Sequence, residues 1–259
     1  MDKRFTCDGA IKTFPNESLS DMSDAENAAI NQDGPKVVKL GEAGRQVETF
    51  FSAMDHSFVE LEMPEGAIET QKFLDCCRSL LPVFNVLGAT VFSPIKADIQ
   101  GNIDKLNKQF STDPAQFATL LNMVQKEVDE GKNALSGFAT EALLWLKRAL
   151  EFIVHLLREI HSGKESLTDC AGVAYGKTLK PHHNWLVRGI FAVATRAMPS
   201  MKAFQRDLAP TPQDAGHPAY TKQLFADCGQ YIVALDAVLE TINAFYRKHK
   251  LEEVAVCVS

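Results

Sequence analysis

The 259-residue sequence predicts an all-α fold of about eight helices. Three observations support this fold class. From Ile68 onward, apolar residues recur at spacings of three and four, which is the period of an amphipathic helix. Residues that start and stop helices separate these runs, as at Thr112-Asp-Pro114 and Ser162-Gly163. No run alternates like a strand, and there is neither an internal repeat nor a glycine-rich phosphate loop.

The first part of the chain, residues 1–60, is predicted to be a polar extension. Residues 1–42 are polar and lack helical periodicity, so we expect them to be largely disordered. A short amphipathic helix that packs on the domain is expected within 46–58, where large apolar side chains recur near helical spacing: Phe50, Phe51, Met54 and Phe58. The domain itself is therefore predicted to occupy residues 61–259.

The first two helices of the domain are separated by Pro82 and Gly88. A helix from about 68 presents an apolar face that ends at Pro82. Pro94 is expected in the first turn of the next helix, where the amide hydrogen that proline lacks would have no partner. That helix continues to about 111, with an apolar stripe of Ile95, Ile99, Ile103 and Leu106.

The remaining helices follow from similar signals. Pro114 follows a capping Thr112-Asp pair and should open a helix that fades at Gly131. The next helix carries leucines around most of its circumference, so it should be central and buried on most sides. From this helix onward the pattern predicts helices at about 137–161, 167–180, 182–198, 200–208 and 212–250.

Composition and charge limit the classes of function that this protein could have. Apolar residues make up 46% of the chain, enough for a substantial core, and the net charge of −6 argues against nucleic acid as a partner. No run approaches the roughly eighteen apolar residues of a membrane span, and the start lacks the hydrophobic segment of a signal peptide. The six cysteines show no metal-type spacing and read as reduced thiols. We therefore expect a cytoplasmic protein.

The helix after Pro94 carries the first candidate site. Asp98, Asn102 and Lys105 fall at i, i+4 and i+7, so they share one face. A carboxylate accepts hydrogen bonds and an amide both donates and accepts them, which suits a polyhydroxylated group. A solvated helix face would show the same pattern.

Two further segments carry candidate residues. Trp145 lies one turn after Glu141 and is either a core residue or a platform on which a sugar ring stacks. Trp185 follows His183 in a neighbourhood with several basic residues, and an indole there suits a bilayer interface. The histidines lack metal-ligand spacing. An acid–base pair of Asp98 and His183 is conceivable, but no nucleophile motif accompanies it, so we predict no enzymatic activity.

Three blocks of this sequence closely resemble the glycolipid transfer protein family: Val91–Lys105, Leu144–Phe152 and His183-Asn-Trp185. They occur in the family's order, and the resemblance extends from about Ile68 through Leu208 and more loosely to the last helix. It implies a two-layer helical sandwich that encloses an apolar pocket for one sphingolipid. The implied function is transfer of glucosyl-, galactosyl- or lactosylceramide between membranes, without catalysis or a cofactor.

The resemblance also implies roles for individual residues. Asp98 and Asn102 would grip the ceramide amide and the first sugar, with Lys105 beside them. Trp145 would stack on the sugar, His183 would bond the amide carbonyl, and Trp185 would contact the membrane. The hydrocarbon pocket would be lined by Phe84, Phe92, Ile95, Phe152, Leu156, Phe191 and Phe204.

A second branch of the family carries ceramide-1-phosphate, whose phosphate requires cations. That branch is similar in having lysine where Asn102 stands and arginine-type positions instead of an indole. Asn102, Trp145 and the acidic Glu141 therefore favour a sugar headgroup. Glu141 stands where the glycolipid branch tends to be apolar, and the end of this chain lacks that branch's tyrosine, so the part played by the C-terminus stays open.

Three other interpretations remain. A glycolipid sensor or scaffold would bind the same lipid without rapid transfer and recruit a protein partner through its N-terminal extension. A hydrolase would act through Asp98 and His183. A purely structural helical bundle would bind no lipid.

Overall fold

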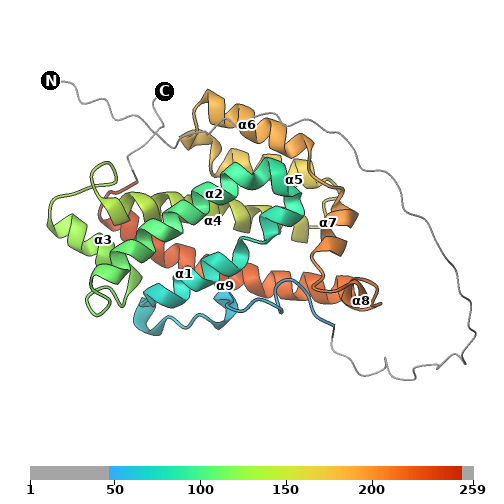
Figure 1. Ribbon diagram of the computed structural model, residues 1–259, viewed down its shortest axis with the longest axis horizontal. Coiled ribbons are helices and arrows are strands. Elements are labelled where there is room, and N and C mark those ends of the chain that lie inside the picture. The colour runs from blue at the N-terminus through green and yellow to red at the C-terminus, as the bar shows by residue number, and fades with distance from the viewer. Residues whose placement is uncertain (1–46, 253–259) are drawn as a thin grey trace, which may run out of the picture. The chain divides into compact units, whose positions relative to one another are not determined.

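The computed structural model describes residues 47–252, and the fold within them is all-α, as the sequence predicts (Figure 1). The predicted disorder of residues 1–42 lies outside the described residues. Within residues 47–252, β pairing is confined to one isolated antiparallel bridge between Glu69 and Thr119.

The described residues form α-helices joined by short 3-10 helices and turns. The α-helices are α1 (Thr70–Leu80), α2 (Val83–Thr112), α3 (Leu120–Asp129), α4 (Phe138–His161), α5 (Leu167–Lys177), α6 (Trp185–Arg196), α7 (Met201–Asp207), α8 (Pro212–Ala215) and α9 (Tyr220–Lys248). The 3-10 helices are η1 (Phe58–Glu60), η2 (Pro64–Gly66) and η3 (Lys180–His182).

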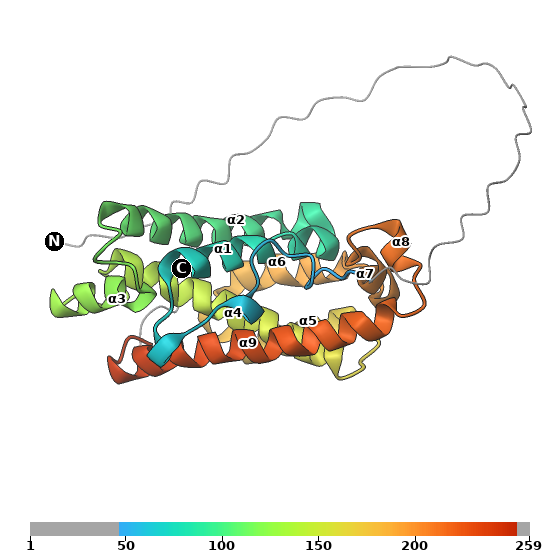
Figure 2. The ribbon, with the colours of Figure 1, turned by 90° about the horizontal axis from the view of Figure 1, so that it is seen from below.

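The helices pack in two layers around α4. α2 lies along one side of α4, flanked by α1 and α6, whereas α5 and α9 lie along the other side (Figures 1 and 2). Most side chains of α4 are buried, which confirms the prediction of a central helix. The apolar stripe of α2 also faces the core, because Ile99, Ile103 and Leu106 are buried.

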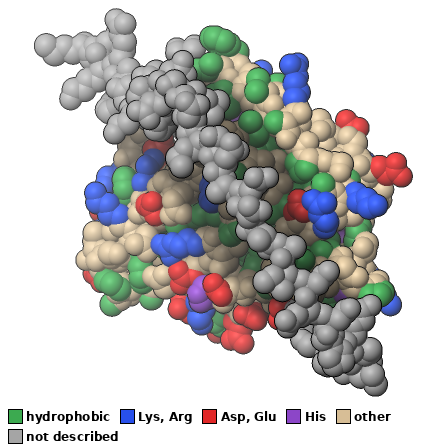
Figure 3. All heavy atoms as spheres, turned by 45° about the vertical axis from the view of Figure 1, so that its right-hand side comes forward, with side chains coloured by type: hydrophobic (Ala, Val, Ile, Leu, Met, Phe, Trp, Pro, Cys, Tyr) green, Lys and Arg blue, Asp and Glu red, His purple; other side chains and the backbone are tan. Residues whose placement is uncertain are grey.

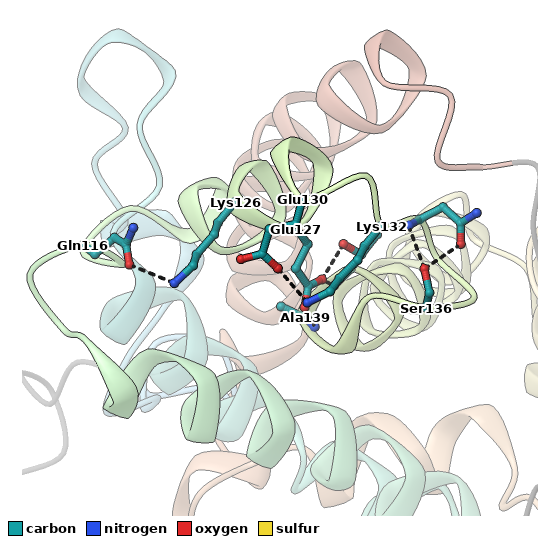
Figure 4. A network of polar contacts seen from close by, with 9 residues as sticks. Gln116, Lys126, Glu127, Glu130, Lys132, Ser136 and Ala139 are labelled. Atoms are coloured by element: carbon teal, nitrogen blue, oxygen red, sulfur yellow. Dashed lines mark hydrogen bonds and ion pairs between the residues drawn. The ribbon is translucent and has the colours of Figure 1, made fainter.

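The start of α4 is capped by a side chain from another helix. Its N-cap residue, Gly137, has no side chain to accept a hydrogen bond. Instead the carboxylate of Glu127, which points from α3 toward α4, accepts from the backbone of Ala139 at 3.0 Å and of Thr140 at 2.8 Å (Figure 4). It also accepts from the Thr140 hydroxyl at 2.7 Å. A negative charge at a helix N-terminus is stabilising, so this contact fixes where α4 begins.

The short helix expected within 46–58 is not present. Residues 47–57 form turns and bends, and the first regular element is η1. Phe51 and Phe58 are nevertheless buried in the main core, where both rings contact Tyr231. Their spacing therefore reflects tertiary packing, and the packed unit begins before residue 61.

Two predicted helix starts are also wrong. α2 resumes directly after Gly88, where the backbone leaves helical geometry with φ at 134°, so Pro94 lies inside the helix. α3 begins at Leu120 and not at Pro114. The intervening residues bond to the start of α1: Thr70 donates to the carbonyl of Ala118 at 2.9 Å, and Leu120 donates to the carbonyl of Ile68 at 2.8 Å.

The long helix expected from 212 to 250 is broken. α8 ends at Ala215, and α9 starts only at Tyr220. Pro218 lies in the break and disfavours helical geometry at the residue before it.

Within residues 47–252, no helix is by itself both long and apolar enough for a bilayer, and only α1 and α2 taken together, bent by 75°, meet that test.

Candidate functional site

The α2 group of candidate residues consists of Asp98, Asn102 and Lys105. Asn102 is buried with 4% of its surface exposed, and its amide donates to the backbone carbonyl of Asp98 at 3.0 Å. Asp98 as a whole is exposed, yet the surrounding protein desolvates its carboxyl and raises its pKa, an effect that the charge of Lys105 opposes. The face therefore presents a partly shielded acid next to a buried amide.

The second group forms where α4 meets the segment between α5 and α6. Trp145 is half-buried, and its ring stacks with that of His183, with centroids 6.0 Å apart and planes inclined by 22°. The Tyr175 hydroxyl of α5 lies 3.0 Å from Nδ1 of His183. Residues from three elements thus meet at one place.

His183 is held neutral. Burial lowers its pKa to about 4, and the charges of His182, Arg148 and Arg188 act in the same direction. A neutral imidazole has one donor and one acceptor nitrogen. With Nδ1 bonded to Tyr175, Nε2 is the nitrogen left to meet a ligand.

The structure brings some predicted residues together and leaves others apart. Trp145 and His183 are in ring contact. The α2 group lies on a helix that packs against α4, but no hydrogen bond or ion pair between described residues joins it to Trp145 or His183. The first group therefore lies on α2, and the second lies on α4 and on the segment between α5 and α6.

The sequence analysis missed two buried cations that lie two and three residues after Trp145. Lys147 and Arg148 each have a side chain only 2% exposed. Glu252, near the end of the described chain, lies 2.6 Å from Lys147 Nζ and 4.0 Å from Arg148. The Arg148 guanidinium also lies 5.0 Å from the centroid of the Trp145 ring. No local pattern reveals these pairs, because the partners are distant in sequence.

The residues predicted to line a hydrocarbon pocket lie in one continuous hydrophobic cluster. All are buried except Ile95, which is half-buried: Phe84, Phe92, Ile95, Phe152, Leu156, Phe191 and Phe204. Phe191 joins this cluster to the polar site, because its ring stacks on Tyr175 with centroids 3.7 Å apart. Phe204 also lines a small apolar cavity with Phe51 and Leu157.

α6 presents an exposed apolar face. Trp185 is 76% exposed, and Leu186, Ile190 and Val193 are exposed with it. Asn184 caps the helix by accepting from the backbone of Val187 at 3.0 Å. Figure 3 shows hydrophobic side chains at the upper edge, the side on which α6 lies in Figure 1.

Within residues 47–252, no group of three histidine, cysteine or acidic side chains is placed to hold a metal ion.

Comparison with known proteins supports the resemblance. The family model described as Glycolipid transfer protein matches residues 68–210. Pleckstrin homology domain-containing family A member 8 of Homo sapiens is 40% identical over 215 residues, which are 82% of this chain and 41% of that protein. The chain thus spans less than half the length of this relative and of its Canis lupus familiaris counterpart, where it covers 45%. A glycolipid transfer protein of Aureobasidium melanogenum is 33% identical over 76% of this chain and 92% of its own.

Solved structures share the fold. One, on how FAPP2 selects simple glycosphingolipids using the GLTP-fold, is 40% identical with a TM-score of 0.75, and covers 80% of this chain and 98% of that one. A mouse ceramide-1-phosphate transfer protein without ligand is 23% identical with a TM-score of 0.68, and covers 80% and 98% of the two chains. At that identity the likeness concerns the fold alone.

Proposed function

Because this chain belongs to the glycolipid transfer protein family, we propose that it carries glycosphingolipids between membrane surfaces and breaks no bond in doing so. The observation that carries this proposal is the Trp145–His183 pair, a half-buried aromatic and a neutral imidazole in contact with the hydrophobic cluster through Tyr175 and Phe191. A polar site at the edge of an apolar interior fits a ligand with a sugar at one end and hydrocarbon at the other.

The barrier to unassisted transfer is hydrophobic. At about 0.8 kcal/mol per buried CH₂, moving a ceramide of about thirty carbons into water costs on the order of 20 kcal/mol. The chains would be kept from water by the hydrophobic cluster that contains Phe84, Phe92 and Phe152. This cluster would have to separate to admit them.

The polar groups would select the headgroup. The Trp145 indole offers an apolar face to a sugar ring, and Asp98 and Asn102 offer acceptors and a donor to its hydroxyls and to the ceramide amide. Nε2 of His183 would donate to the amide carbonyl, with Tyr175 holding Nδ1. Lys105 would contribute a charge that favours the ionised form of Asp98 and opposes the upward shift of its pKa caused by burial. A lipid without these hydroxyls would leave buried polar groups unpaired, which is unfavourable.

The membrane would be met by α6. Its exposed Trp185, Leu186 and Val193 provide an apolar surface, and the adjacent Arg188 provides positive charge. The protein would therefore act in the cytoplasm and bind membranes peripherally and transiently. A protein partner for the N-terminal extension falls on residues 1–46, outside the described part of the chain.

The headgroup is proposed to be a sugar and not a phosphate. The FAPP2 structure concerns simple glycosphingolipids and shares 40% identity with this chain, which supports that assignment. Around Trp145 the two buried cations, Lys147 and Arg148, already face the carboxylate of Glu252, and Glu141 adds a further exposed acid. A phosphate would meet these negative charges.

The test is transfer of labelled glucosylceramide between vesicles, run beside ceramide-1-phosphate. Asp98→Val and Trp145→Ala should each slow glucosylceramide transfer roughly tenfold or more, since each removes a direct headgroup contact. Asp104→Val is the matched control, because Asp104 is an exposed acid of the same helix that bonds Gln100.

The alternatives give different results. Faster movement of ceramide-1-phosphate would contradict the sugar assignment. Binding of glucosylceramide without transfer would indicate a sensor or scaffold. Hydrolysed lipid after long incubation would indicate an enzyme, and a folded protein that binds neither lipid would refute the proposal.

A further inference from the structure

The chain reverses direction at the end of α9. Lys250 adopts a left-handed conformation with φ at 55°. Its amide donates to the carbonyl of Arg247 at 3.2 Å, and the amide of Leu251 donates to the carbonyl of Tyr246 at 2.9 Å. This pattern of bonds is a Schellman motif, which closes a helix and turns the chain back. Leu251 is buried at 3% exposure, so the turn is anchored on the core.

The reversal brings Glu252 to two buried cations of α4. Its two carboxylate oxygens face different partners, Oε1 at 2.6 Å from Lys147 and Oε2 at 4.0 Å from Arg148. Glu151 also approaches Lys147, at 3.6 Å. Burying a cation is costly unless an anion compensates it. Glu252 supplies one such anion, from a position far from Lys147 in the sequence.

Arg148 connects this ion cluster to the candidate headgroup site. Its guanidinium lies 5.0 Å from the centroid of the Trp145 ring, within the range of a cation–π interaction. Trp145 also stacks with His183, and the Arg148 charge reaches that imidazole too. A displacement of the guanidinium would therefore change the surroundings of both Trp145 and His183, the two residues proposed to contact the lipid.

We propose that Glu252 is a positioning residue of the headgroup site: its carboxylate bridges Lys147 and Arg148 and thereby holds the guanidinium against the Trp145 indole. Glu252 does not itself contact the lipid. It couples the turn after α9 to the stacking surface on α4. This inference rests on the proposed function, since it concerns how the same site is held in its binding geometry.

The test uses the fluorescence of Trp145 as its readout. The chain has two tryptophans, so replacing the exposed Trp185 by phenylalanine leaves Trp145 as the sole indole. In this background, Glu252→Gln removes the charge at nearly constant shape, and Glu252→Asp keeps the charge on a shorter side chain. Glu240→Gln is the matched control, because Glu240 is an exposed acid of α9 that pairs only with Arg247 among the described residues.

Two measurements are made on the full chain. The first is the Trp145 emission spectrum without lipid, and the second is the affinity for a short-chain glucosylceramide, read from Trp145 fluorescence. Glu252→Gln should shift the emission and weaken binding about tenfold. Glu252→Asp should fall between the Trp185→Phe parent and Glu252→Gln, and Glu240→Gln should match the Trp185→Phe parent.

The proposal is overturned if Glu252→Gln keeps both the emission and the affinity of the Trp185→Phe parent, even if its melting temperature falls, since Glu252 would then act on stability alone. If Glu252→Gln does not fold, unchanged emission and affinity in Glu252→Asp overturn it instead. Failure of the wild-type protein to bind glucosylceramide would contradict the proposed function, while the lipid-free emission would still decide whether Glu252 holds the Arg148 guanidinium against the indole.

Discussion

His183 shows how its surroundings set the chemistry of one side chain. It is partly buried between Trp145 and Tyr175, and neighbouring positive charges add to the effect of burial. Both influences favour the uncharged ring. A neutral imidazole can donate to a carbonyl without carrying a charge into an apolar site, which fits the role proposed for it.

This protonation state predicts a pH dependence of stability. The pKa of His183 is about 4 in the folded protein, against 6.5 for an unperturbed histidine, which stands for the unfolded chain. Between these values the unfolded chain binds a proton that the folded chain does not, so the free energy of unfolding should fall as the pH drops from 6.5 toward about 4. Above pH 6.5 this contribution is fully present and constant.

The measurement is urea unfolding of the wild-type protein and of His183→Gln across that pH window. The variant lacks the titrating group, so its free energy of unfolding should decrease less steeply with acidification. Equal slopes for the two proteins would show that His183 is not held neutral.

Among the elements, α4 depends most on a residue outside itself. The carboxylate of Glu127 accepts from two backbone amides and one hydroxyl at the start of α4. Glu127→Ala would leave these buried donors without their partner and should lower the free energy of unfolding by about 2–3 kcal/mol.

Glu130→Ala is the matched comparison for that change. Glu130 lies at the same end of α3 but is exposed and pairs with Lys132 on the surface. Its loss should leave the free energy of unfolding nearly unchanged, because exposed ion pairs contribute little to stability. Similar denaturation midpoints for the two variants would contradict the capping role of Glu127.

α6 is the element expected to meet the membrane. Val193→Asp places a charge in its exposed apolar face and should reduce binding to vesicles roughly tenfold, because that face would have to enter the bilayer interface. Val233→Asp on α9 is the control, since Val233 is similarly exposed on another helix. Vesicle flotation measures both, and equal losses would indicate that α6 is not the contact surface.

At the scale of the whole molecule, local signals predicted the helices well where a single residue decides the boundary. Gly163 has a positive φ just after α4 ends, and Gly131 has one just after α3. The predictions at Phe51 and Pro114 were wrong because long-range contacts decide the conformation there. Phe51 packs on Tyr231. The residues after Pro114 form backbone hydrogen bonds beside Ile68, so α3 begins only at Leu120.

The candidate site likewise contains residues that the sequence could predict and one that it could not. Asp98, Asn102 and Trp145 could be singled out from helical spacing and from resemblance, because each lies in a local motif. Glu252 could not, since its partners lie on α4 and only the turn at Lys250 brings it there. Sequence spacing carries no information about such a contact.

The irregular backbone at Gly88 has a mechanical consequence. Gly88 lies between Phe84 and Phe92, whose rings are 6.4 Å apart within the hydrophobic cluster. Its φ of 134° is far from helical, and an alanine there would be strained as well as close to Val91. α2 therefore consists of two helical segments that join at Gly88. A hinge at this point would let the Phe84 end swing away from Phe92 through rotation of a few backbone dihedrals, without unwinding either helical segment.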